Sequence, residues 1–285
     1  MPFLYIMHGG GLPRRLVVGF LLPILVVCAI CTSAWGAGDD GQKLAEHIGL
    51  PLNVLYIALQ PGYEDLRVVA YYSLMHGSRV RVAFVTNGEA GEHDHRSMYP
   101  HELAATHRLE AAATLERFNA EVYFLNMPDV VSASDSLVVR SFWAAESLQA
   151  RCRALIMEFL PDVILLAGDR ESDDPLRLNI VHSDVLAAVR DVARDSVAPW
   201  KVSRVALEST SRNAVVIPID RRTKSGEPTA RSLADSRGSL YTSMSVQRMR
   251  WTQSMTPSFS VVHPPTFTGK VLEAGIPGNL PASVR

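Results

Sequence analysis

The stretch from Asn53 to Leu59 constrains the fold more than any other part of the sequence. It reads Asn-Val-Leu-Tyr-Ile-Ala-Leu, and such a short, nearly continuous apolar run is typical of a parallel strand buried on both faces. Pro61 and Gly62 end the strand. The carboxylates Glu64 and Asp65 follow at the expected first turn of a helix, where negative charge is favoured. Ligands bind at the carboxyl ends of such strands, so the sequence predicts a binding site just after Leu59.

Strands and helices alternate along the rest of the sequence. Apolar runs predict further strands at residues 79–86, 121–125, 162–167, 202–207 and 214–219. Helical patterns predict helices at 66–77, 102–118 and 142–160, and one more with a face of Val185, Ala188, Val189 and Val192. Because this alternation implies βαβ crossovers, we expect an α/β, Rossmann-like three-layer fold with a mostly parallel sheet. The strand at 214–219 is expected at an edge because it contains Pro218.

The chain is predicted to have three parts. Residues 1–37 read as a secretory signal, because two arginines precede an apolar run from Leu16 to Ile30 and small residues follow it. The run is shorter than the roughly 20 residues of a membrane span. We therefore expect export to the periplasm or the extracellular space, with an uncleaved membrane anchor as the alternative. Residues 38–220 are expected to form the α/β domain.

The third part, residues 221–285, is expected to be a C-terminal extension that is loop-rich and partly helical. Its polar, Gly- and Ser-rich residues 221–239 predict a loop. A helix is expected at 240–255, and the Pro-rich tail from Pro257 is expected to wrap the surface or to lack order.

The charge balance and the absence of certain motifs exclude several classes of function. The chain has 28 Lys and Arg against 29 Asp and Glu, a formal net charge of -1, which gives no electrostatic reason to expect nucleic acid. No Gly-x-Ser-x-Gly elbow supports a serine nucleophile, and no Gly-rich phosphate-binding loop follows a strand. The predicted partner is a small molecule, with a membrane involved only through an uncleaved N-terminal segment.

The cysteines give no reason to expect redox chemistry. Cys28 and Cys31 belong to the apolar N-terminal segment, where we interpret their Cys-x-x-Cys spacing as accidental. Cys152 shares a helical stripe with Leu148, Leu155 and Phe159. This pattern predicts a buried, unreactive thiol and no intrachain disulfide.

Five features of the sequence occur in the order and spacing of one known family. They are Gln-Pro-Gly-Tyr-Glu (Gln60 to Glu64), Val-Thr-Asn-Gly-Glu-Ala-Gly (Val85 to Gly91), Phe-Leu-Asn-Met-Pro-Asp (Phe124 to Asp129), Leu-Pro-Asp-Val-Ile-Leu (Leu160 to Leu165) and a His that opens a helix (His182). Together they resemble the PIG-L/LmbE family of N-deacetylases, which includes GlcNAc-PI de-N-acetylase-like proteins, over residues 52–207. The resemblance implies a Rossmann-like fold and metal-dependent hydrolysis of a C–N bond.

The resemblance also implies a zinc site, but this chain replaces most of its residues. Family members end the first strand with His-Pro-Asp-Asp-Glu and begin a later helix with His-Pro-Asp-His. The first His, the second Asp and the last His bind zinc, and the first Asp is the general base on zinc-bound water. In the first motif this chain has Gln60 for the His, Gly62 for the base and Tyr63 for the ligand Asp, and it keeps Glu64. An amide, a missing side chain and a phenol are poor substitutes for an imidazole and two carboxylates.

The second motif and the substrate-holding pattern also depart from the family. Asn179 stands where the resemblance implies a His that assists the tetrahedral intermediate, and only the ligand position His182 is kept. The family's Arg-x-x-Glu pattern falls at His107 and Glu110, with Arg108 one residue out of register. The sequence therefore supports no firm catalytic residue or metal site. The candidate pocket residues are Gln60, Gly62, Tyr63, Glu64, His107, Asp129, Asn179 and His182.

Two functions remain open. The favoured one is an exported binding pseudoenzyme with no cofactor, which holds a sugar or an amide-bearing ligand such as an N-acetylated sugar. The alternative is an active hydrolase that removes acetyl from such a compound at a relocated zinc site, with His93, His95 and His182 as candidate ligands. The acidic loop 169–174 could supply oxygen ligands, although a solvated charge run is the commoner explanation.

Overall fold

The computed structural model describes residues 51–90, 98–130, 135–168, 175–195, 202–209, 214–222, 226–243 and 257–263. Within these ranges the strands form a sheet with the order β3-β2-β1-β4-β5-β7-β6. They are β1 (Asn53–Ala58), β2 (Arg79–Thr86), β3 (Ala120–Met127), β4 (Val163–Leu166), β5 (Arg204–Glu208), β6 (Val215–Val216) and β7 (Ser258–His263). Strands β1 to β5 pair in parallel, and β7 is antiparallel to β5 and β6. The predicted α/β fold with a mostly parallel sheet is confirmed, while the predicted signal segment 1–37 lies outside the described residues.

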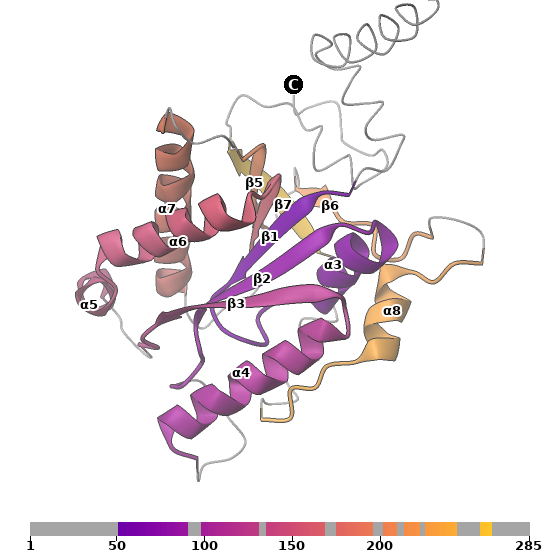
Figure 1. Cartoon of the computed structure of the whole chain (residues 1–285), viewed down its shortest axis with the longest axis horizontal. Helices are drawn as coiled ribbons and strands as arrows, with labels where there is room; N and C mark the ends of the chain where they lie inside the picture. The colour runs from indigo at the N-terminus through magenta and orange to yellow at the C-terminus, as the bar shows by residue number, and fades with distance from the viewer. Residues whose placement is uncertain are drawn as a thin grey trace, which may run out of the picture. The chain divides into compact units, whose positions relative to one another are not determined.

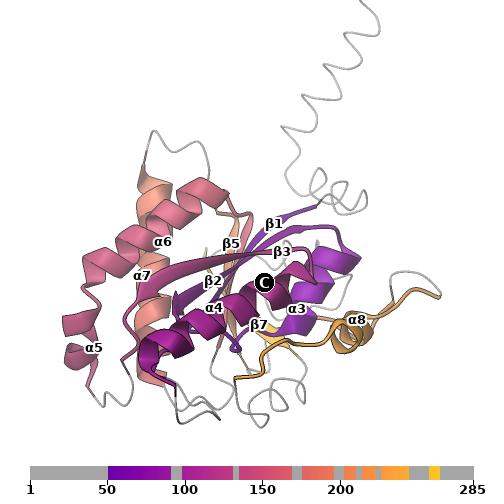
Figure 2. The same ribbon diagram turned by 60° about the horizontal axis from the view of Figure 1, so that its bottom comes forward.

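Helices cover both faces of the sheet. They are α3 (Leu66–Ala70), the π-helical turn η1 (Tyr71–Met75), α4 (Pro100–Glu116), α5 (Ser136–Phe142), α6 (Ala145–Phe159), α7 (Pro175–Arg194) and α8 (Ala230–Arg237). Helices α3, α4 and α8 lie on one face, and α5, α6 and α7 lie on the other (Figure 1, Figure 2). No helix within the described ranges combines the length and the apolar character that a membrane span requires.

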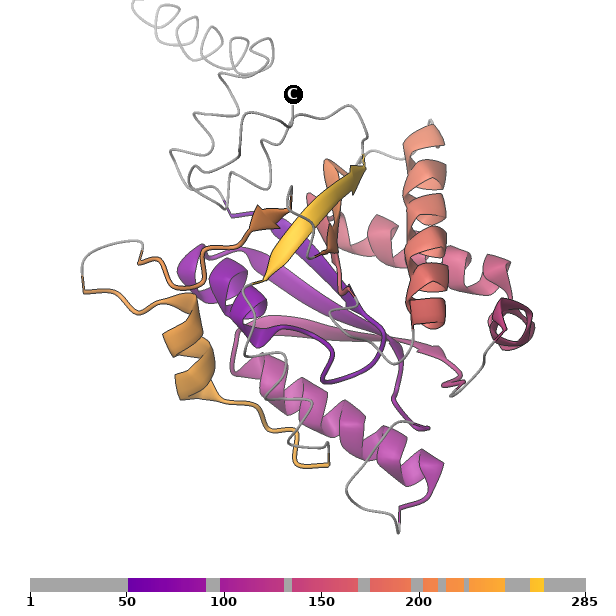
Figure 3. The same ribbon diagram turned by 180° about the vertical axis from the view of Figure 1, so that it is seen from behind.

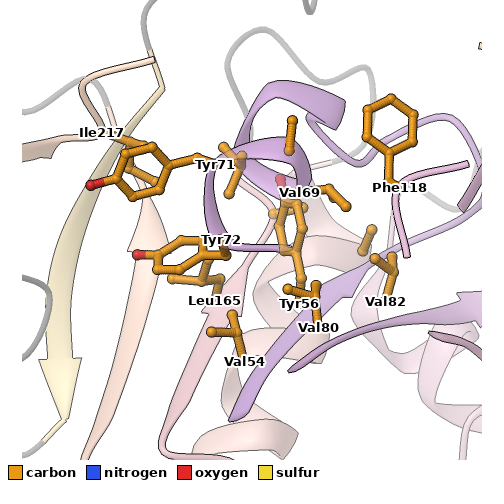
Figure 4. Close-up of a cluster of buried hydrophobic side chains, with 14 of the residues drawn as sticks. Val54, Tyr56, Val69, Tyr71, Tyr72, Val80, Val82, Phe118, Leu165 and Ile217 are labelled. Atoms are coloured by element: carbon orange, nitrogen blue, oxygen red, sulfur yellow. The ribbon is translucent and has the colours of Figure 1, made fainter. Parts of the chain in front are cut away.

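Strand β1 lies between β2 and β4, with its two faces in two separate hydrophobic clusters. Val54 and Tyr56 belong to the cluster that packs against α3, and Leu55 and Ile57 belong to the cluster that packs against α6 and α7. Figure 4 shows Val54 and Tyr56 in the first cluster beside Leu165 of β4. All four strand residues are at most 2% exposed, as expected for a strand covered on both faces.

The helix predicted at 142–160 is confirmed as α6, and the separate short helix α5 precedes it. Helix α5 ends at Phe142, and α6 begins at Ala145. Between them Trp143 has φ -106° and ψ 81°, which is outside the helical region. Its indole is fully buried, and its Nε1 donates a 2.7 Å hydrogen bond to the carbonyl of Pro128. This tertiary anchor, which the helical pattern could not show, explains the break.

The predictions for the apolar faces of α6 and α7 are confirmed. Cys152 is fully buried, together with Leu148, Leu155 and Phe159. Burial raises the pKa of the Cys152 thiol to about 12, so the thiol is protonated and unreactive at neutral pH. The face of α7 predicted from its valines and alanines is buried as well.

The prediction of a loop over 221–239 is wrong for α8. Thr229 and Ser232 begin this helix with a capping box, in which each side chain bonds the backbone N–H of the other. The buried residues of α8 are Ala230 and Ala234. Small residues bury little apolar area, so this face gave only a weak signal in the sequence. Residues 240–243 are not helical, and the rest of the helix predicted at 240–255 lies outside the described residues.

The prediction for the tail from Pro257 is wrong for β7. This strand pairs with both β5 and β6 (Figure 3), and Phe259 is fully buried in the core. Strand β6 is the last in the strand order, so the predicted edge position near Pro218 is confirmed. The described part of the C-terminal segment therefore completes the sheet.

Candidate functional site

The turn after β1 leads from the sheet to α3. The carbonyl of Leu59 accepts a 2.8 Å hydrogen bond from Thr86 N, which continues the contact with β2. Tyr63 N donates to the carbonyl of Gln60 at 3.2 Å, and Gly62 has a φ of 84°, where glycine is favoured. Gly62 therefore serves the geometry of the turn. It places no side chain where the family resemblance implies a general base.

Glu64 is 3% exposed, and hydrogen bonds engage both of its carboxylate oxygens. Gly62 N donates to Oε2 at 2.8 Å, and the hydroxyl of Tyr241 donates to Oε1 at 2.6 Å. Burial raises the pKa of Glu64 to about 7, although these hydrogen bonds lower it, and the charge of Asp65 raises it further. Glu64 thus joins the turn to the segment 226–243.

Asp65 begins helix α3. Its Oδ1 accepts a 2.9 Å hydrogen bond from Arg67 N, and its Oδ2 forms a buried 2.6 Å ion pair with Nη2 of Arg67. A carboxylate at this position satisfies a backbone N–H that has no partner within the helix. The interpretation of Asp65 as a partner of the helix N-terminus is therefore confirmed.

His107 of α4 lies against the loop that follows β2. It is 1% exposed, and its Nδ1 lies 3.2 Å from the carbonyl oxygen of Asn87. A Cβ built on Gly88 would lie 2.8 Å from Nδ1 of His107 and 3.8 Å from Cβ of Gln60. The structure thus places Gln60 and His107, which belong to different motifs, next to the same glycine.

Asp129, which follows β3, connects the loop after β2 to helix α7. Its Oδ2 accepts a 3.0 Å hydrogen bond from Ala90 N, and its own N donates to Oε1 of Glu89 at 3.0 Å. Its Oδ1 pairs with Arg177 near the start of α7, and the two side chains are 0% and 6% exposed. The predicted pocket residue Asp129 therefore fixes the positions of Glu89 and Ala90.

His182 lies at the carboxyl end of β4, next to β1. Its Nε2 is 3.2 Å from the carbonyl oxygen of Ala167, whose own N donates to the carbonyl of Ile57 at 2.8 Å. Burial lowers the pKa of His182, and the contact with Ala167 offsets part of this shift. The neutral ring can donate from Nε2 to Ala167 and keep a lone pair on Nδ1. Asn179, one turn earlier on α7, is exposed.

Glu110 contacts the C-terminal segment in this chain. Its Oε1 accepts hydrogen bonds from N and Oγ1 of Thr242 at 2.9 and 2.6 Å, and from Ser243 N at 3.1 Å. Burial would raise the pKa of Glu110, but the hydrogen bonds from Ser243 and Thr242 lower it below its ordinary value. Arg108 is exposed and donates to Oδ1 of Asn126 at 2.6 Å. Neither residue reproduces a substrate-holding Arg-x-x-Glu pair.

The described residues do not fit a zinc site of the family type. Among them, no three His, Cys, Asp or Glu side chains are arranged so that they could hold a metal ion. The ligand positions carry the amide of Gln60, the phenol of Tyr63 and a His182 whose Nε2 faces a backbone carbonyl. His93, His95 and the acidic loop 169–174 lie outside the described ranges, so a relocated site stays a prediction.

Sequence reasoning missed four residues of this region. They are Asn87, Glu89, Arg177 and Tyr241. The first two lie in the stretch Val85 to Gly91, whose likeness to the family was a usable signal. Tyr241 is 177 residues from its partner Glu64, and Arg177 is 48 residues from Asp129. No local pattern marks contacts over such distances.

The fold and the position of these side chains define an α/β protein with a candidate site at the carboxyl edge of a parallel sheet. Residues 68–192 match the model of the PIG-L family, described as GlcNAc-PI de-N-acetylase. The resemblance to this family that was predicted from the sequence is therefore confirmed over these residues.

Several solved structures are similar to this chain at low sequence identity. The 4-carboxy-2-hydroxymuconate hydratase GalB of Pseudomonas putida is 14% identical with a TM-score of 0.50, over 76% of this chain and 98% of the hydratase. A conserved protein of Thermus thermophilus and the N,N'-diacetylchitobiose deacetylase of Pyrococcus horikoshii are 17% and 18% identical, each with a TM-score of 0.40, over 55% and 56% of this chain. The matches cover 65% and 61% of those two proteins, less than two thirds of their lengths. The comparison with curated proteins gave no significant match.

Proposed function

We propose that this protein is a binding pseudoenzyme, which holds a sugar or an amide-bearing small molecule and lacks the zinc-dependent hydrolysis typical of its family. The observation that carries the proposal is the turn after β1. There Gln60, Gly62 and Tyr63 replace an imidazole and two carboxylates. The acid that remains, Glu64, already accepts hydrogen bonds from Gly62 and Tyr241.

Amide hydrolysis requires a base that activates water and an electrophile that polarises the carbonyl. Gly62 offers no base. Glu64 has a pKa of about 7, which suits a base, but protein donors engage both of its oxygens. Burial lowers the pKa of His182, so the ring is neutral at pH 7 and supplies no positive charge to an oxyanion. These side chains support binding better than catalysis.

The carboxyl edge of the sheet carries side chains that suit a polar ligand. Gln60 and Asn87 present carboxamides, which can donate and accept hydrogen bonds, and His107 lies beside them. Tyr63 is half-buried and adds an aromatic ring. Sugar-binding sites commonly need such a combination of paired donors, acceptors and a flat apolar face.

Export is part of the proposal. The charged, apolar and small-residue regions of residues 1–37 support a secretory signal. Expression of the full chain followed by N-terminal sequencing of the secreted fraction tests this point. A new N-terminus between Ala34 and Ala37 is expected. An intact N-terminus in the membrane fraction would instead indicate an anchor, and an intact N-terminus in the cytoplasm would contradict export.

Titration calorimetry combined with an acetate assay tests the binding function. We expect N-acetylglucosamine to bind saturably and to release no acetate. A hydrolase with a relocated metal site would release acetate and would lose this activity on His182→Ala. The variant His101→Ala, at an exposed position of α4, is the matched control. Release of acetate, or a lack of any sugar binding, would overturn the proposal.

A further inference from the structure

Three buried acceptor oxygens at the carboxyl edge of the sheet have no hydrogen-bond partner among the described residues. They are Oε1 of Gln60, Oδ1 of Asn87 and Oε2 of Glu89. Gln60 as a whole is only 3% exposed. A buried acceptor without a donor destabilises the folded state, and the effect is larger for a charged group. Three such oxygens in one region therefore point to a ligand that brings donors.

The three side chains belong to neighbouring parts of the chain. Asn87 and Glu89 flank Gly88, and a Cβ built on Gly88 would lie 3.8 Å from Cβ of Gln60. Strands β1 and β2, which precede these residues, are parallel neighbours in the sheet. Their carboxyl ends meet at the edge where α/β proteins bind ligands.

Among the described residues, Glu89 accepts a hydrogen bond through one of its two carboxylate oxygens. Its Oε1 accepts a 3.0 Å hydrogen bond from Asp129 N. Asp129 is itself fixed, because it pairs with Arg177 and accepts a 3.0 Å hydrogen bond from Ala90 N. The protein therefore positions the Glu89 carboxylate in advance, and the second oxygen, Oε2, has no donor within the described part of the chain.

We infer that Gln60, Asn87 and Glu89 form a subsite for the protonated amino group of an amino sugar. A charge-assisted hydrogen bond is roughly twice as strong as a neutral one, so a carboxylate favours a cationic donor. A primary ammonium group carries three N–H donors, which equals the number of open acceptors. This inference rests on the proposed binding function and names its ligand class.

The same chemistry disfavours the acetylated form of the sugar. An N-acetyl group carries no charge and has a single N–H, so it offers one donor to the three acceptors and no charge-assisted hydrogen bond to Glu89. Glu89 would then keep its charge buried without a cationic partner. The subsite therefore selects the free amine over the amide.

Calorimetric titration of the full chain with glucosamine, N-acetylglucosamine and glucose, at a mildly acidic pH that protonates the amine, tests this selectivity. We expect glucosamine to bind about 10-fold or more tightly than either other sugar. Glu89→Gln keeps an acceptor for Asp129 N and puts an amide NH2 in place of the open oxygen. It should weaken glucosamine binding about 10-fold or more and change N-acetylglucosamine binding by less than about 2-fold. Glu116→Gln, at an exposed position of α4, should change neither.

The other possible results of these titrations separate a failure of the amine subsite from a failure of the proposed binding function. Equal affinity for glucosamine and N-acetylglucosamine would overturn the inference and leave the binding function standing. Binding of Ca²⁺ or Mg²⁺ that Glu89→Gln removes, without selective binding of glucosamine, would assign the oxygens to a metal cation and also overturn it. Failure of all three sugars to bind would overturn both proposals. Release of acetate would overturn the pseudoenzyme function, while the amine selectivity would still be measured by the titrations.

A second variant keeps the inference testable if Glu89→Gln does not fold. Asn87→Asp adds a second negative charge to the subsite and leaves the backbone contact with His107 available. It should tighten glucosamine binding about 10-fold without tightening glucose binding. An unchanged ratio of the two affinities would overturn the inference.

Discussion

The hydroxyl of Tyr241 donates a 2.6 Å hydrogen bond to Oε1 of Glu64, and the two residues are 177 positions apart in the sequence. Both residues are buried. The contact joins the C-terminal segment to the turn where the family resemblance predicts metal ligands. Glu64, the acid that ends the Gln-Pro-Gly-Tyr-Glu motif, thus has a structural role in this chain.

Removal of the Tyr241 hydroxyl should destabilise the fold. Tyr241→Phe leaves a buried Glu64 oxygen without its donor, at an expected loss of about 1–3 kcal/mol in the free energy of unfolding. Urea denaturation measures the change. Tyr72→Phe is the matched control, because the buried Tyr72 hydroxyl has no partner within the described residues. The control should be neutral or slightly stabilising, and an equal loss in both variants would contradict the role of the contact.

The pKa of Glu64 predicts a pH dependence of stability. Burial raises this pKa from 4.5 to about 7, so between these values the folded state binds the proton more tightly than the unfolded state. The contribution of Glu64 is therefore fully present below about pH 4.5 and is lost as pH rises toward 7. Glu64→Gln should be close to neutral at pH 5 and stabilising by up to about 3 kcal/mol at pH 8.

Denaturation of wild type and Glu64→Gln across this pH range measures the difference. Glu116→Gln, which changes an exposed acid, should give a difference that does not vary with pH. A constant difference for Glu64→Gln would contradict the raised pKa.

A side chain added at Gly88 should destabilise the fold. An added Cβ would meet Nδ1 of His107 at 2.8 Å, and the residue has a φ of 73°. Gly77→Ala is the matched control, since Gly77 has a φ of 63° and no atom within 4 Å of an added Cβ. We expect a loss of about 1 kcal/mol for Gly77→Ala from the backbone, and a further 1–3 kcal/mol or so for Gly88→Ala from the steric contact. Thermal denaturation measures both variants. Equal losses of stability would contradict this prediction, because they would show that the His107 ring can move away from an added Cβ.

The Asp129–Arg177 pair should stabilise the loop that carries Glu89. Loss of one member of a buried ion pair leaves the other charge uncompensated, so Asp129→Asn should destabilise the protein by about 3–5 kcal/mol. Asp220→Asn breaks a pair whose acid is 63% exposed and should cost less than about 1 kcal/mol. Urea denaturation compares the two variants. Similar small losses in the free energy of unfolding for both variants would contradict this role, because they would show that other groups compensate the charge of Arg177.

The sequence predicted those parts of the fold that depend on local pattern. The apolar run of β1 and the valine and alanine face of α7 are buried as expected. Helix α8 and strand β7 were missed for different reasons. The face of α8 is built from small alanines, and β7 gains its stability from pairing with β5, which lies about 50 residues earlier.

The candidate site was predictable only where a motif marked it. The family resemblance pointed to Gln60 and His182, and the structure places both at the carboxyl ends of neighbouring strands. Asn179 also follows from the motif, but it is exposed. The bonds that fix Glu89 run through Asp129 to Arg177, and a sequence pattern does not report such tertiary contacts.

Zinc content of the purified protein tests the central claim most directly. Elemental analysis after exposure to zinc and removal of loosely bound metal should find well under one zinc per chain, and His182→Ala should not change the value. One zinc per chain that disappears on His182→Ala would contradict the account, because it would show that other residues restore the metal site.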